Sequence, residues 1–582
     1  MQVTNADVAG ILDEVANLLE ITGESFFRVR AYRNASRMIR DLSTPLHVIA
    51  GGPGNELEKL PGIGKDLAAR ISEILQTGDL TLRADLEARL PRGVIELMKV
   101  PGLGPRKAHT LFLELGVCDL DSLEKAAHEG KVKGIKGFGP KTEANILEGI
   151  EAAAGFGKRL LWAEAEAAVN KVLEHMHGAP GLERIEVAGS FRRRAETVGD
   201  LDFLAVGAEE APLLERFQSV PGVERVIARG PTKVSQVIHP GLQVDMRAVS
   251  PDCFGAALIY FTGSQTHNVA LRGLAVRRGL KLNEYGLSRE EERVAGRTEE
   301  DVYEALGMPW IPPELRENRG EIGAAIEGEL PQLISDSDIR GDLHVHTDAT
   351  DGRDTLEAMI DAARSKGHAY IAITNHTKKV SMAGGLNGAG LAADWDNVEA
   401  AAALRKGIRV LKGVEVDILD DGSLDIPDEV LARADYVVAS VHYNMKMPRA
   451  RMTRRIVKAM ENPHVHVIGH PTGRKINKRP AYPVDTEELL AAAARTCTWL
   501  ELNASPDRLD IDDKTCHEAK KHGILVSIAT DAHSVRGLDF MRYGVNQARR
   551  GWLEKSDVLN TLNYRELHAV LHVKRDRMSR HH

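Results

Sequence analysis

The sequence is poor in cysteine, in long apolar runs and in excess positive charge, and each absence excludes a class of protein. No apolar run approaches the ~18 residues of a transmembrane helix and the first residues lack a signal-peptide pattern, so we predict no membrane or export role. The few cysteines match neither a disulfide framework nor a zinc motif, which predicts a cytoplasmic protein. They are Cys118, Cys253, Cys497 and Cys516.

Charge and length limit the remaining possibilities. Lysine and arginine number 76 against 84 aspartates and glutamates, and the formal net charge is -8. Contact with a nucleic acid would therefore depend on local groups rather than on bulk charge. A chain of 582 residues is too long for one hydrophobic core and predicts several domains, roughly three to five.

Three similar hairpin units interrupt the short amphipathic helices expected in residues 1–150. Each unit is a Gly-x-Gly turn that leads into a helix, so backbone N–H groups at the helix start can bind phosphate without base contacts. A single copy would fit an ordinary helix cap, but repetition with basic residues after the turn favours DNA binding. The repeat resembles the helix-hairpin-helix motif of DNA repair proteins. The predicted contacts are Gly62, Gly64, Lys65, Gly102, Gly104, Arg106, Lys107 and, in the weakest copy, Lys141.

Paired acids follow a Gly-Ser turn in the middle of the chain. Asp200 and Asp202 are two residues apart on one predicted strand, so they face the same side. Two carboxylates about 4 Å apart repel by roughly 4 kcal/mol at an effective dielectric constant of about 20, so the pair needs a cation. With Asp245 from another predicted strand, three carboxylates could hold two Mg²⁺ ions for phosphoryl transfer. Alternating acids on a solvated edge strand are the alternative interpretation.

The turn and the residues that follow resemble the family X DNA polymerases, the group of polymerase beta. The matching motifs are Gly189-Ser190, Tyr260-Phe-Thr-Gly-Ser264, Asn268, Arg272 and Leu282-Asn-Glu-Tyr-Gly286. The resemblance implies Mg²⁺ or Mn²⁺ at the three aspartates and a deoxynucleoside triphosphate as substrate. It further implies that Ser190, Arg193 and Gly263 contact the triphosphate. Tyr260 and Phe261 would form a wall beside the sugar, and Asn268 would contact the base. From the residues alone, the apolar run 257–261 could also be a core strand.

The first helices resemble the lyase subdomain of the same family, through Val29-Arg-Ala-Tyr32-Arg33 and the first hairpin unit. The family lysine that forms a Schiff base with an abasic sugar falls at Arg70 in this chain. A guanidinium stays protonated and cannot act as that nucleophile. We therefore expect weak or absent deoxyribose-phosphate lyase activity from this position.

Metal-type side chains stand at the ends of successive apolar runs in the last part of the chain. These runs alternate with helical stretches, which predicts parallel strands joined by crossover helices. Side chains at the strand ends would then meet at one rim of an α/β barrel. A buried histidine that satisfies a strand-end hydrogen bond is the alternative for any single position. The nine residues are His344, His346, Asp351, His376, Glu415, His442, His470, Asp531 and His533.

This set resembles the polymerase and histidinol phosphatase (PHP) domain, which holds up to three Zn²⁺ or Mn²⁺ ions. The resemblance implies three ligand groups: His344, His346, Glu415 and Asp531; Glu415, His442 and His470; and Asp351, His376 and His533. Such ions lower the pKa of bound water to about 7, and open coordination positions indicate catalysis. The family usually has an aspartate where this chain has Asn375, and the amide would weaken the site if that aspartate orients a ligand.

Basic segments follow two of these histidines, at residues 444–458 and 474–479. Their charge would flank the metal rim and attract a polyanion, so they favour DNA over a small phosphate ester. Arg454 and Arg455 are the predicted DNA contacts. A solvated helix face is the alternative for the first segment.

The predicted fold is multidomain, α/β and α+β. The expected divisions are a lyase-like helical subdomain with a helix-hairpin-helix (1–85), a second helix-hairpin-helix subdomain (86–155), a nucleotidyltransferase palm (156–250), a nucleotide-selection subdomain (251–318), a linker (319–340) and a distorted (βα)7 PHP barrel (341–575). The resemblance implies a monomeric DNA polymerase that fills gapped or nicked DNA in base-excision repair. The PHP domain would add a 3'-5' exonuclease, with abasic-site cleavage as a further activity. Two alternatives are a DNA-end binding scaffold with structural metals, and a PHP domain that acts as a small-molecule phosphatase.

Overall fold

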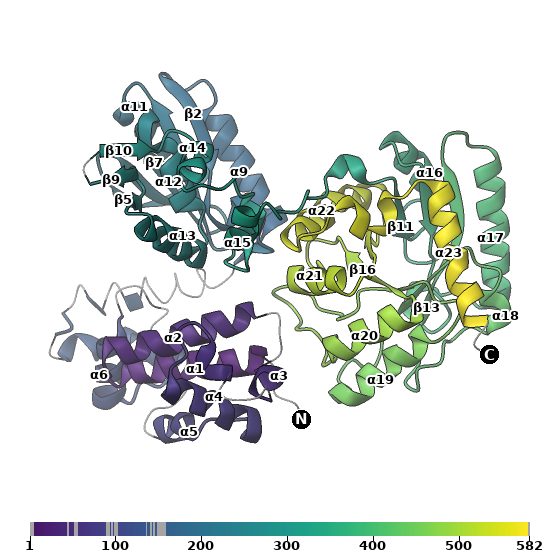
Figure 1. Ribbon diagram of the computed structural model, residues 1–582, viewed down its shortest axis with the longest axis horizontal. Coiled ribbons are helices and arrows are strands. Elements are labelled where there is room, and N and C mark those ends of the chain that lie inside the picture. Colours follow the sequence, from purple (N-terminus) through teal and green to yellow (C-terminus); the bar gives the residue numbers. More distant parts are fainter. Residues whose placement is uncertain are drawn as a thin grey trace. The chain divides into compact units, whose positions relative to one another are not determined.

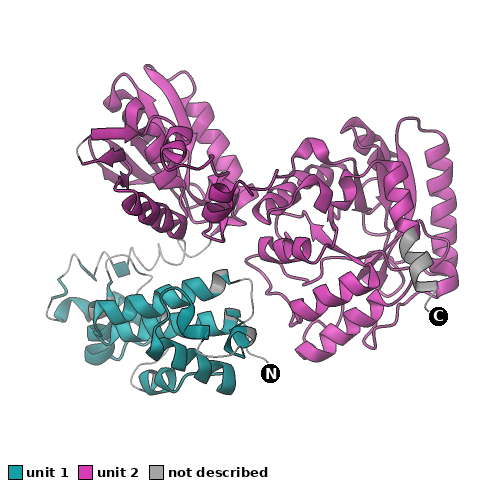
Figure 2. Ribbon diagram, viewed as in Figure 1, with its two compact units in different colours: residues 1–158 teal, residues 159–582 magenta. Residues whose placement is uncertain are grey.

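The structure is a computed structural model that divides into two compact units, residues 1–158 and residues 159–582 (Figure 2). It describes residues 5–42, 46–51, 56–88, 94, 97, 100, 103–135, 137–139, 142–143, 146–147, 159–290 and 292–579. Over these residues, no helix combines the length and the hydropathy that a transmembrane span requires. Each unit has hydrophobic clusters of its own.

The first unit is helical, as the sequence predicts. Its helices bury one apolar face each around a shared core that includes Leu12, Ile39, Ile71 and Leu111. Asp119 is the N-cap residue of the last of these helices, and its side chain accepts from Ser122 N in a capping box. The helices are α1 (Asn5–Ile21), α2 (Phe26–Asp41), α3 (Leu46–Ala50), α4 (Lys65–Thr77), α5 (Thr81–Glu87), α6 (Pro105–Leu115) and α7 (Leu120–His128).

The second unit begins with a mixed five-stranded sheet in the order β2-β4-β7-β6-β5, and β4 and β7 are its parallel pair. Helices α9 (Trp162–Met176) and α11 (Glu210–Gln218) pack on this sheet through a core that contains Phe203 and Phe217. A short pair, β1 (Leu160–Leu161) and β3 (Thr197–Val198), lies beside it. The strands of the sheet are β2 (Leu182–Val187), β4 (Asp200–Gly207), β5 (Val223–Arg229), β6 (Lys233–Ile238) and β7 (Leu242–Ala248).

A smaller subdomain follows, with helices around a three-stranded sheet in the order β10-β9-β8. Glu299 joins it to the domain of the five-stranded sheet, because its carboxylate accepts two hydrogen bonds from Arg192 and two from Arg316. Despite burial, these guanidinium groups hold the pKa of Glu299 well below its usual value. The elements are α12 (Phe254–Thr262), α13 (Gln265–Arg277), β8 (Lys281–Asn283), β9 (Gly286–Arg289), β10 (Glu292–Ala295), α14 (Glu299–Ala305) and α15 (Glu321–Glu327).

The segment 319–340, which the sequence predicts to be a linker, is packed into the fold. Glu321 is fully buried and contacts His267 Nδ1 at 2.6 Å, and Ile334 is fully buried in the core of the following domain. This segment therefore joins two domains by buried contacts rather than as an extended tether.

The C-terminal domain is a barrel of seven parallel strands in chain order, β11 to β17. A parallel bridge between Val345 and Ala532 brings the first strand next to the last. The predicted distorted (βα)7 barrel is thus confirmed, with helices outside the strands (Figure 1). The strands are β11 (Gly341–Val345), β12 (Tyr370–Ile373), β13 (Arg409–Asp417), β14 (Tyr436–Ser440), β15 (Val467–Ile468), β16 (Trp499–Asn503) and β17 (Val526–Ala529). The helices are α16 (Leu356–Ser365), α17 (Gly388–Ala403), α18 (Asp428–Leu431), α19 (Arg449–Met460), α20 (Thr486–Thr496), α21 (Asp513–Lys521), α22 (Met541–Arg550) and α23 (Tyr564–Ser579).

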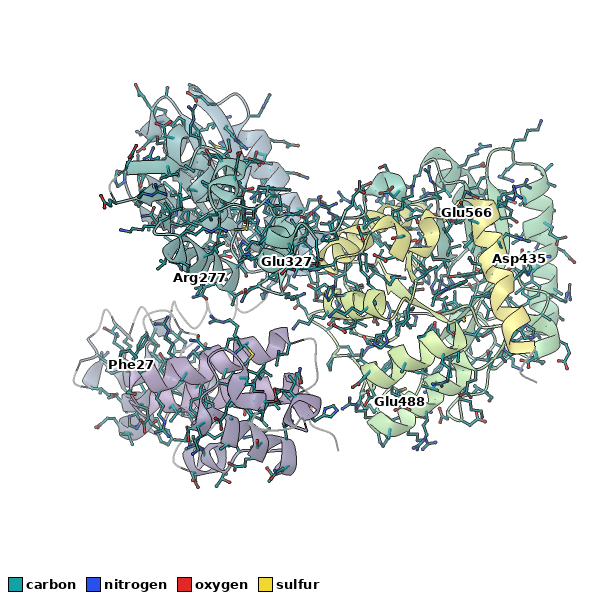
Figure 3. The ribbon with its side chains drawn as sticks, in the orientation of Figure 1. Phe27, Arg277, Glu327, Asp435, Glu488 and Glu566 are labelled. Atoms are coloured by element: carbon teal, nitrogen blue, oxygen red, sulfur yellow. The ribbon has the colours of Figure 1, made fainter. Side chains whose placement is uncertain are left out.

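The barrel strands are mostly buried and apolar: every residue of β12 and β14 is buried, whereas β13 begins with the exposed Arg409. Val437, Val438 and Ala439 of β14 have no exposed surface, whereas charged side chains such as Asp435 and Glu488 project from the exterior (Figure 3). Polar residues inside such a barrel are costly unless they are paired or bind a ligand. The polar groups at the strand ends are therefore the candidates for function.

Candidate functional site

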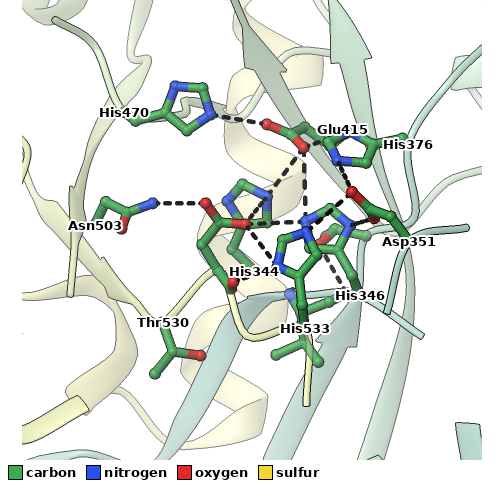
Figure 4. Close-up of polar contacts among 12 residues, drawn as sticks. His344, His346, Asp351, His376, Glu415, His470, Asn503, Thr530 and His533 are labelled. Atoms are coloured by element: carbon green, nitrogen blue, oxygen red, sulfur yellow. Dashed lines mark hydrogen bonds and ion pairs between the residues drawn. The ribbon is translucent and has the colours of Figure 1, made fainter. Parts of the chain in front are cut away.

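All nine predicted metal-type residues of the barrel meet at one rim. His344 lies on β11 and Glu415 on β13, while most of the others directly follow the ends of strands. Asp351 comes from the loop between β11 and α16. Figure 4 shows the side chains pointing toward a common centre. The predicted convergence of strand ends therefore brings residues together from across almost 200 positions of sequence.

Glu415 lies at the centre of this group and is 1% exposed. Its Oε2 atom lies 2.9 Å from His376 Nδ1, and its Oε1 atom lies 3.2 Å from His470 Nε2. Three further imidazole nitrogens lie within 3.4 to 3.6 Å of the carboxylate, those of His344, His346 and His442. One carboxylate with an oxygen on each side thus connects the two halves of the cluster (Figure 4).

The atoms of the cluster fit divalent cations. Both oxygens of Glu415, both ring nitrogens of His346 and Nε2 of His344 are buried without a hydrogen-bond partner. Orphaned buried polar atoms are unfavourable, so they indicate a bound partner. Imidazole and carboxylate together are ligands suited to Zn²⁺ and Mn²⁺.

The potential ligands form three groups, in each of which one atom per residue lies within 4.8 Å of the others. These groups differ from the three that the resemblance implies, because His346 belongs to two of them and His376 joins Glu415. The groups are His346, Asp351, His376 and His533; His344, His346 and Asp531; and His376, Glu415 and His442.

The pKa shifts of the histidines indicate that the carboxylates at the centre of the cluster need positive charge beside them. Although burial opposes it, Glu415 and Asp351 raise the pKa of His376 to about 10. Burial and the neighbouring His376 lower the pKa of His346 to about 3, so this imidazole is neutral at pH 7 and available as a ligand. The carboxylates of the site are therefore balanced by protons or by cations.

Three supporting residues were not predicted from the sequence. Glu501 Oε2 lies 2.6 Å from His344 Nδ1, and Asp417 Oδ1 lies 3.3 Å from His442 Nδ1. Asn503 donates to Asp531 Oδ2 at 3.1 Å. Such contacts fix the ring orientation of a ligating histidine. The available signal was a polar residue inside an apolar strand: Asp417 follows Glu415 by two, and Glu501 lies in the middle of β16.

The side-chain hydrogen bonds of Asn375 go to Thr347, Thr350 and Asp394 rather than to the nine residues, although its backbone oxygen accepts from Glu415 N at 3.2 Å. Its side-chain oxygen accepts from Thr347 N at 2.9 Å, and its amide nitrogen lies 3.1 Å from Asp394 Oδ2. Asp394 is 7% exposed, and an aspartate at position 375 would place a second carboxylate beside it, which is unfavourable unless one of the two takes up a proton. The amide is thus matched to Asp394, and it supports the loop that leads to Asp351.

The three predicted aspartates of the palm lie on neighbouring strands. Asp202 on β4 is the register partner of Asp245 on β7, and Asp200 precedes Asp202 by two on the same strand. Burial and the carboxylates of Asp200 and Asp245 raise the pKa of Asp202 to about 7. Lys233 Nζ lies 2.5 Å from Asp245 Oδ2 and supplies part of the missing positive charge. These acids fit a divalent cation bound by oxygen ligands.

The Gly-Ser turn lies against these acids at α10 (Gly189–Arg192). Gly189 has a φ of +64°, and a Cβ there would lie 3.1 Å from Asp202 Oδ2. Glycine is thus required both by the left-handed backbone and by the close approach of the carboxylate. Arg193 Nε lies 3.1 Å from Glu317 Oε1, so this predicted phosphate contact is held by a carboxylate in the structure.

The other predicted nucleotide contacts lie on the following subdomain. Tyr260 and Asn268 line a pocket together with Arg272. The Asn268 side chain donates to Tyr260 O at 2.7 Å, and its Oδ1 atom is buried without a partner. Phe261 lies under the Arg247 guanidinium, at 4.7 Å from the ring centroid. The run 257–261 forms part of helix α12 and not a core strand.

Two hairpin turns of the first unit expose backbone at helix starts. Gly64 is the N-cap residue of α4 and Gly104 that of α6, in both cases without a side-chain cap. A Cβ at Gly62, Gly64 or Gly104 would meet nothing within 4 Å, and Lys65 beside the first turn is exposed. The turns thus leave room for a phosphate at the helix N-terminus. Gly102, Lys141 and the side chain of Arg106 lie outside the described residues, and Lys107 lies 6.0 Å from the Phe138 ring.

Most of the basic side chains beside the barrel rim are already paired. Arg455 is 3% exposed and donates to the carbonyl oxygens of Leu419 and Tyr443, so its guanidinium is held inside the fold. The other pairs are Arg449 with Asp485, Lys458 with Asp421, Arg474 with Glu196, and Lys475 and Lys478 with Asp507. Arg451 and Arg454 are exposed, and neither has a salt bridge to a described residue.

Family models match most of this architecture. A helix-hairpin-helix domain matches residues 3–80, and a SAM-like helix-hairpin-helix tandem matches residues 94–152. The DNA polymerase beta thumb matches residues 257–317, and the PHP domain matches residues 342–503. The fold and the two acidic sites thus define a beta-type polymerase joined to a PHP domain, as the sequence resemblance predicts.

Whole-chain similarity gives the family. The chain is 36% identical over 569 residues to the DNA polymerase/3'-5' exonuclease PolX of Bacillus subtilis, which covers 97% of this chain and 99% of that protein. It therefore belongs to the PolX family. Its PHP region is also similar to probable phosphatases. One from Thermoanaerobacter sp. is 30% identical over 38% of this chain and 89% of its own length, and one from Caldanaerobacter subterraneus is 32% identical over 33% and 75%.

Proposed function

We propose that this chain is a DNA polymerase that fills short gaps and carries a 3'-5' exonuclease in its PHP domain. The observation that supports this best is the presence of two separate acidic centres on two domains of one chain. Asp202 and its neighbours form the first, and Glu415 with its ring of imidazoles forms the second. The PolX relative from Bacillus subtilis has both activities in its name.

In the polymerase half, Asp200, Asp202 and Asp245 would hold Mg²⁺ or Mn²⁺. A divalent ion bound there stabilises the charge of the attacking and leaving oxygens in phosphoryl transfer. The chain itself would position the substrate: Ser190 provides a donor beside the triphosphate, Gly263 leaves room next to the Arg193 guanidinium, and Tyr260 restricts the space beside the sugar. The buried Oδ1 atom of Asn268 is available to accept from a donor group of the incoming nucleotide or of the primer end.

In the PHP half, the nine residues of the rim would hold Zn²⁺ or Mn²⁺. A divalent ion in this site lowers the pKa of bound water to about 7 and so supplies a hydroxide for phosphodiester hydrolysis. Glu501 and Asp417 keep the imidazoles of His344 and His442 oriented. Abasic-site cleavage is the narrower expectation for the same centre.

The proposal is tested with a 5'-labelled primer annealed across a short gap, incubated with Mn²⁺. Without deoxynucleotides, the primer should shorten in single-nucleotide steps; with them, it should lengthen to the end of the gap. A chain that retains metal but neither lengthens nor shortens the primer would be a DNA-end scaffold instead. Lengthening without shortening would remove the exonuclease from the proposal.

A small-molecule phosphatase is the second candidate for the PHP domain. It is favoured by the probable phosphatases among the relatives and by the neutralised basic side chains at the rim. Arg451 and Arg454 distinguish the candidates, because these exposed guanidinium groups on α19 can pair with DNA phosphates but are not needed for a small ester.

Replacing Arg451 and Arg454 together by alanine should lower the rate of DNA hydrolysis at physiological salt by roughly tenfold. Turnover of p-nitrophenyl phosphate should change by less than about twofold, since no catalytic contact is removed. Lys458→Ala is the matched control, because Lys458 is exposed on the same helix but is paired with Asp421. Equal losses on both substrates would contradict a DNA-binding role for this helix.

A further inference from the structure

Helix α22 of the PHP domain is buried where it faces the polymerase half of the second unit. Gln547 is 1% exposed and Arg550 is 7% exposed. The Gln547 side chain donates to Glu196 Oε1 at 2.6 Å, and Asn546 accepts from Arg194. Both partners lie in the segment that follows the Gly-Ser turn. These contacts are therefore made within three positions of Arg193, the proposed triphosphate contact.

Arg550 contacts this segment through charge-assisted hydrogen bonds. Its Nη1 atom donates to the carbonyl oxygen of Arg193 at 2.8 Å and to Glu317 Oε1 at 3.0 Å. Its Nη2 atom donates to Asp513 Oδ2 at 2.9 Å, and Asp513 accepts a second bond from Arg319 at 3.0 Å. Buried ionic groups with several partners of this kind hold one geometry.

Glu317 extends the contact to the side chain of Arg193. The same Oε1 atom accepts from Arg193 Nε at 3.1 Å. Although burial opposes it, Arg550 and Arg193 keep the pKa of Glu317 below its usual value, so the carboxylate is ionised. Arg193 Nη1 donates to Thr262 O, and its Nη2 atom bonds to no described residue. One nitrogen of Arg193 thus remains for a ligand while the other two are fixed.

We propose that Arg550 is a positioning residue of the polymerase site, supplied by the PHP domain, and that it sets the affinity for the incoming triphosphate. The inference rests on the proposed role of Arg193 as a triphosphate contact. Arg550 anchors the Arg193 main chain and shares the charge of Glu317. Without Arg550, Glu317 is balanced mainly by Arg193, with a smaller contribution from Arg319. This reduces the positive charge that Arg193 offers to a phosphate and frees the turn.

The test is single-nucleotide insertion by full-length Arg550→Ala. Its KM for the deoxynucleotide should rise roughly tenfold, whereas kcat should fall by less than about threefold. The exonuclease rate of the same preparation should stay within about twofold of that of the unsubstituted chain. Arg542→Ala is the matched control, since Arg542 lies on the same helix and pairs across the same domain contact with Glu166, but does not reach Arg193. Its KM should not change.

Arg550→Lys provides the second variant, because lysine keeps the charge but cannot bond three oxygens in one plane. Its KM should lie between those of the unsubstituted chain and Arg550→Ala. Equal KM values for Arg550→Ala and Arg542→Ala would overturn the proposal, as would an equal loss of extension and exonuclease, which indicates a structural role only. Failure of the proposed function is distinguishable, because the unsubstituted chain would then not extend the primer at all.

Discussion

Asp202→Asn should abolish primer extension and leave the 3'-5' shortening of the same primer unchanged. Asparagine keeps the size of the side chain but removes the charge of the most buried member of the pair on β4. Burial and the neighbouring acids already raise the pKa of Asp202 to about 7, so this group binds a cation strongly only when it is ionised. The extension rate should therefore fall by ~10³ or more, measured with a gapped template and saturating deoxynucleotides.

Asp252→Asn provides the matched control within the polymerase half. Asp252 is exposed and lies 3.8 Å from Arg297, so its loss should have little effect on extension. The shortening reaction, run without deoxynucleotides, reports the PHP site in the same tube. If Asp202→Asn also stopped shortening, the two activities would share one centre and the assignment of two sites would be wrong.

The positions of the aspartates and of the rim residues could be predicted because strand geometry determines them. Asp200 and Asp202 face one side since strand side chains alternate, and the rim residues of the barrel meet since parallel strands end on the same side. This alternation does not predict which residues of two neighbouring strands are paired. That Asp202 is paired with Asp245, rather than with Gln243 two residues away, is a result of the fold.

The parts that could not be predicted depend on side chains from distant segments. The segment after His470 has a strong positive charge in sequence, but Arg474 is paired with Glu196, 278 residues away. Arg455 lies in a basic run and yet is buried, because helix α19 directs it to carbonyl oxygens rather than to solvent. A run of charged residues therefore predicts the sign of a segment's charge, but not whether its side chains are free to contact DNA.

The sequence also left one apolar run ambiguous between a helix and a strand. Residues 257–261 have no periodicity that separates a buried helix from a buried strand, and the structure places them in α12. The motif that follows was nonetheless informative, since Gly263 has a φ of +70° that favours glycine. Local backbone requirements of this kind are visible in a sequence, whereas the side of an apolar run that becomes buried is decided by its neighbours.

Glu415→Gln should have the opposite effect to Asp202→Asn, with loss of exonuclease and normal extension. Glutamine has the same shape but no charge, and its amide group cannot accept on both sides. The two oxygens of Glu415 face five imidazoles, so the substitution removes the charge that these five rings share. Shortening of the primer should fall by roughly a hundredfold or more.

Metal binding gives a readout of the same variant that does not depend on catalysis. A cation that binds only the folded chain raises Tm, and at a given concentration tighter binding gives a larger increase, so Mn²⁺ should raise Tm of the unsubstituted chain more than that of Glu415→Gln. His344→Ala should behave like Glu415→Gln, because His344 Nε2 lies 3.4 Å from the same carboxylate. Glu488→Gln, exposed on α20, is the control and should retain both the Tm increase and the exonuclease. An undiminished Mn²⁺ effect in Glu415→Gln would mean that the carboxylate is not a ligand, and the ions would then have to be held by the histidines and aspartates around it.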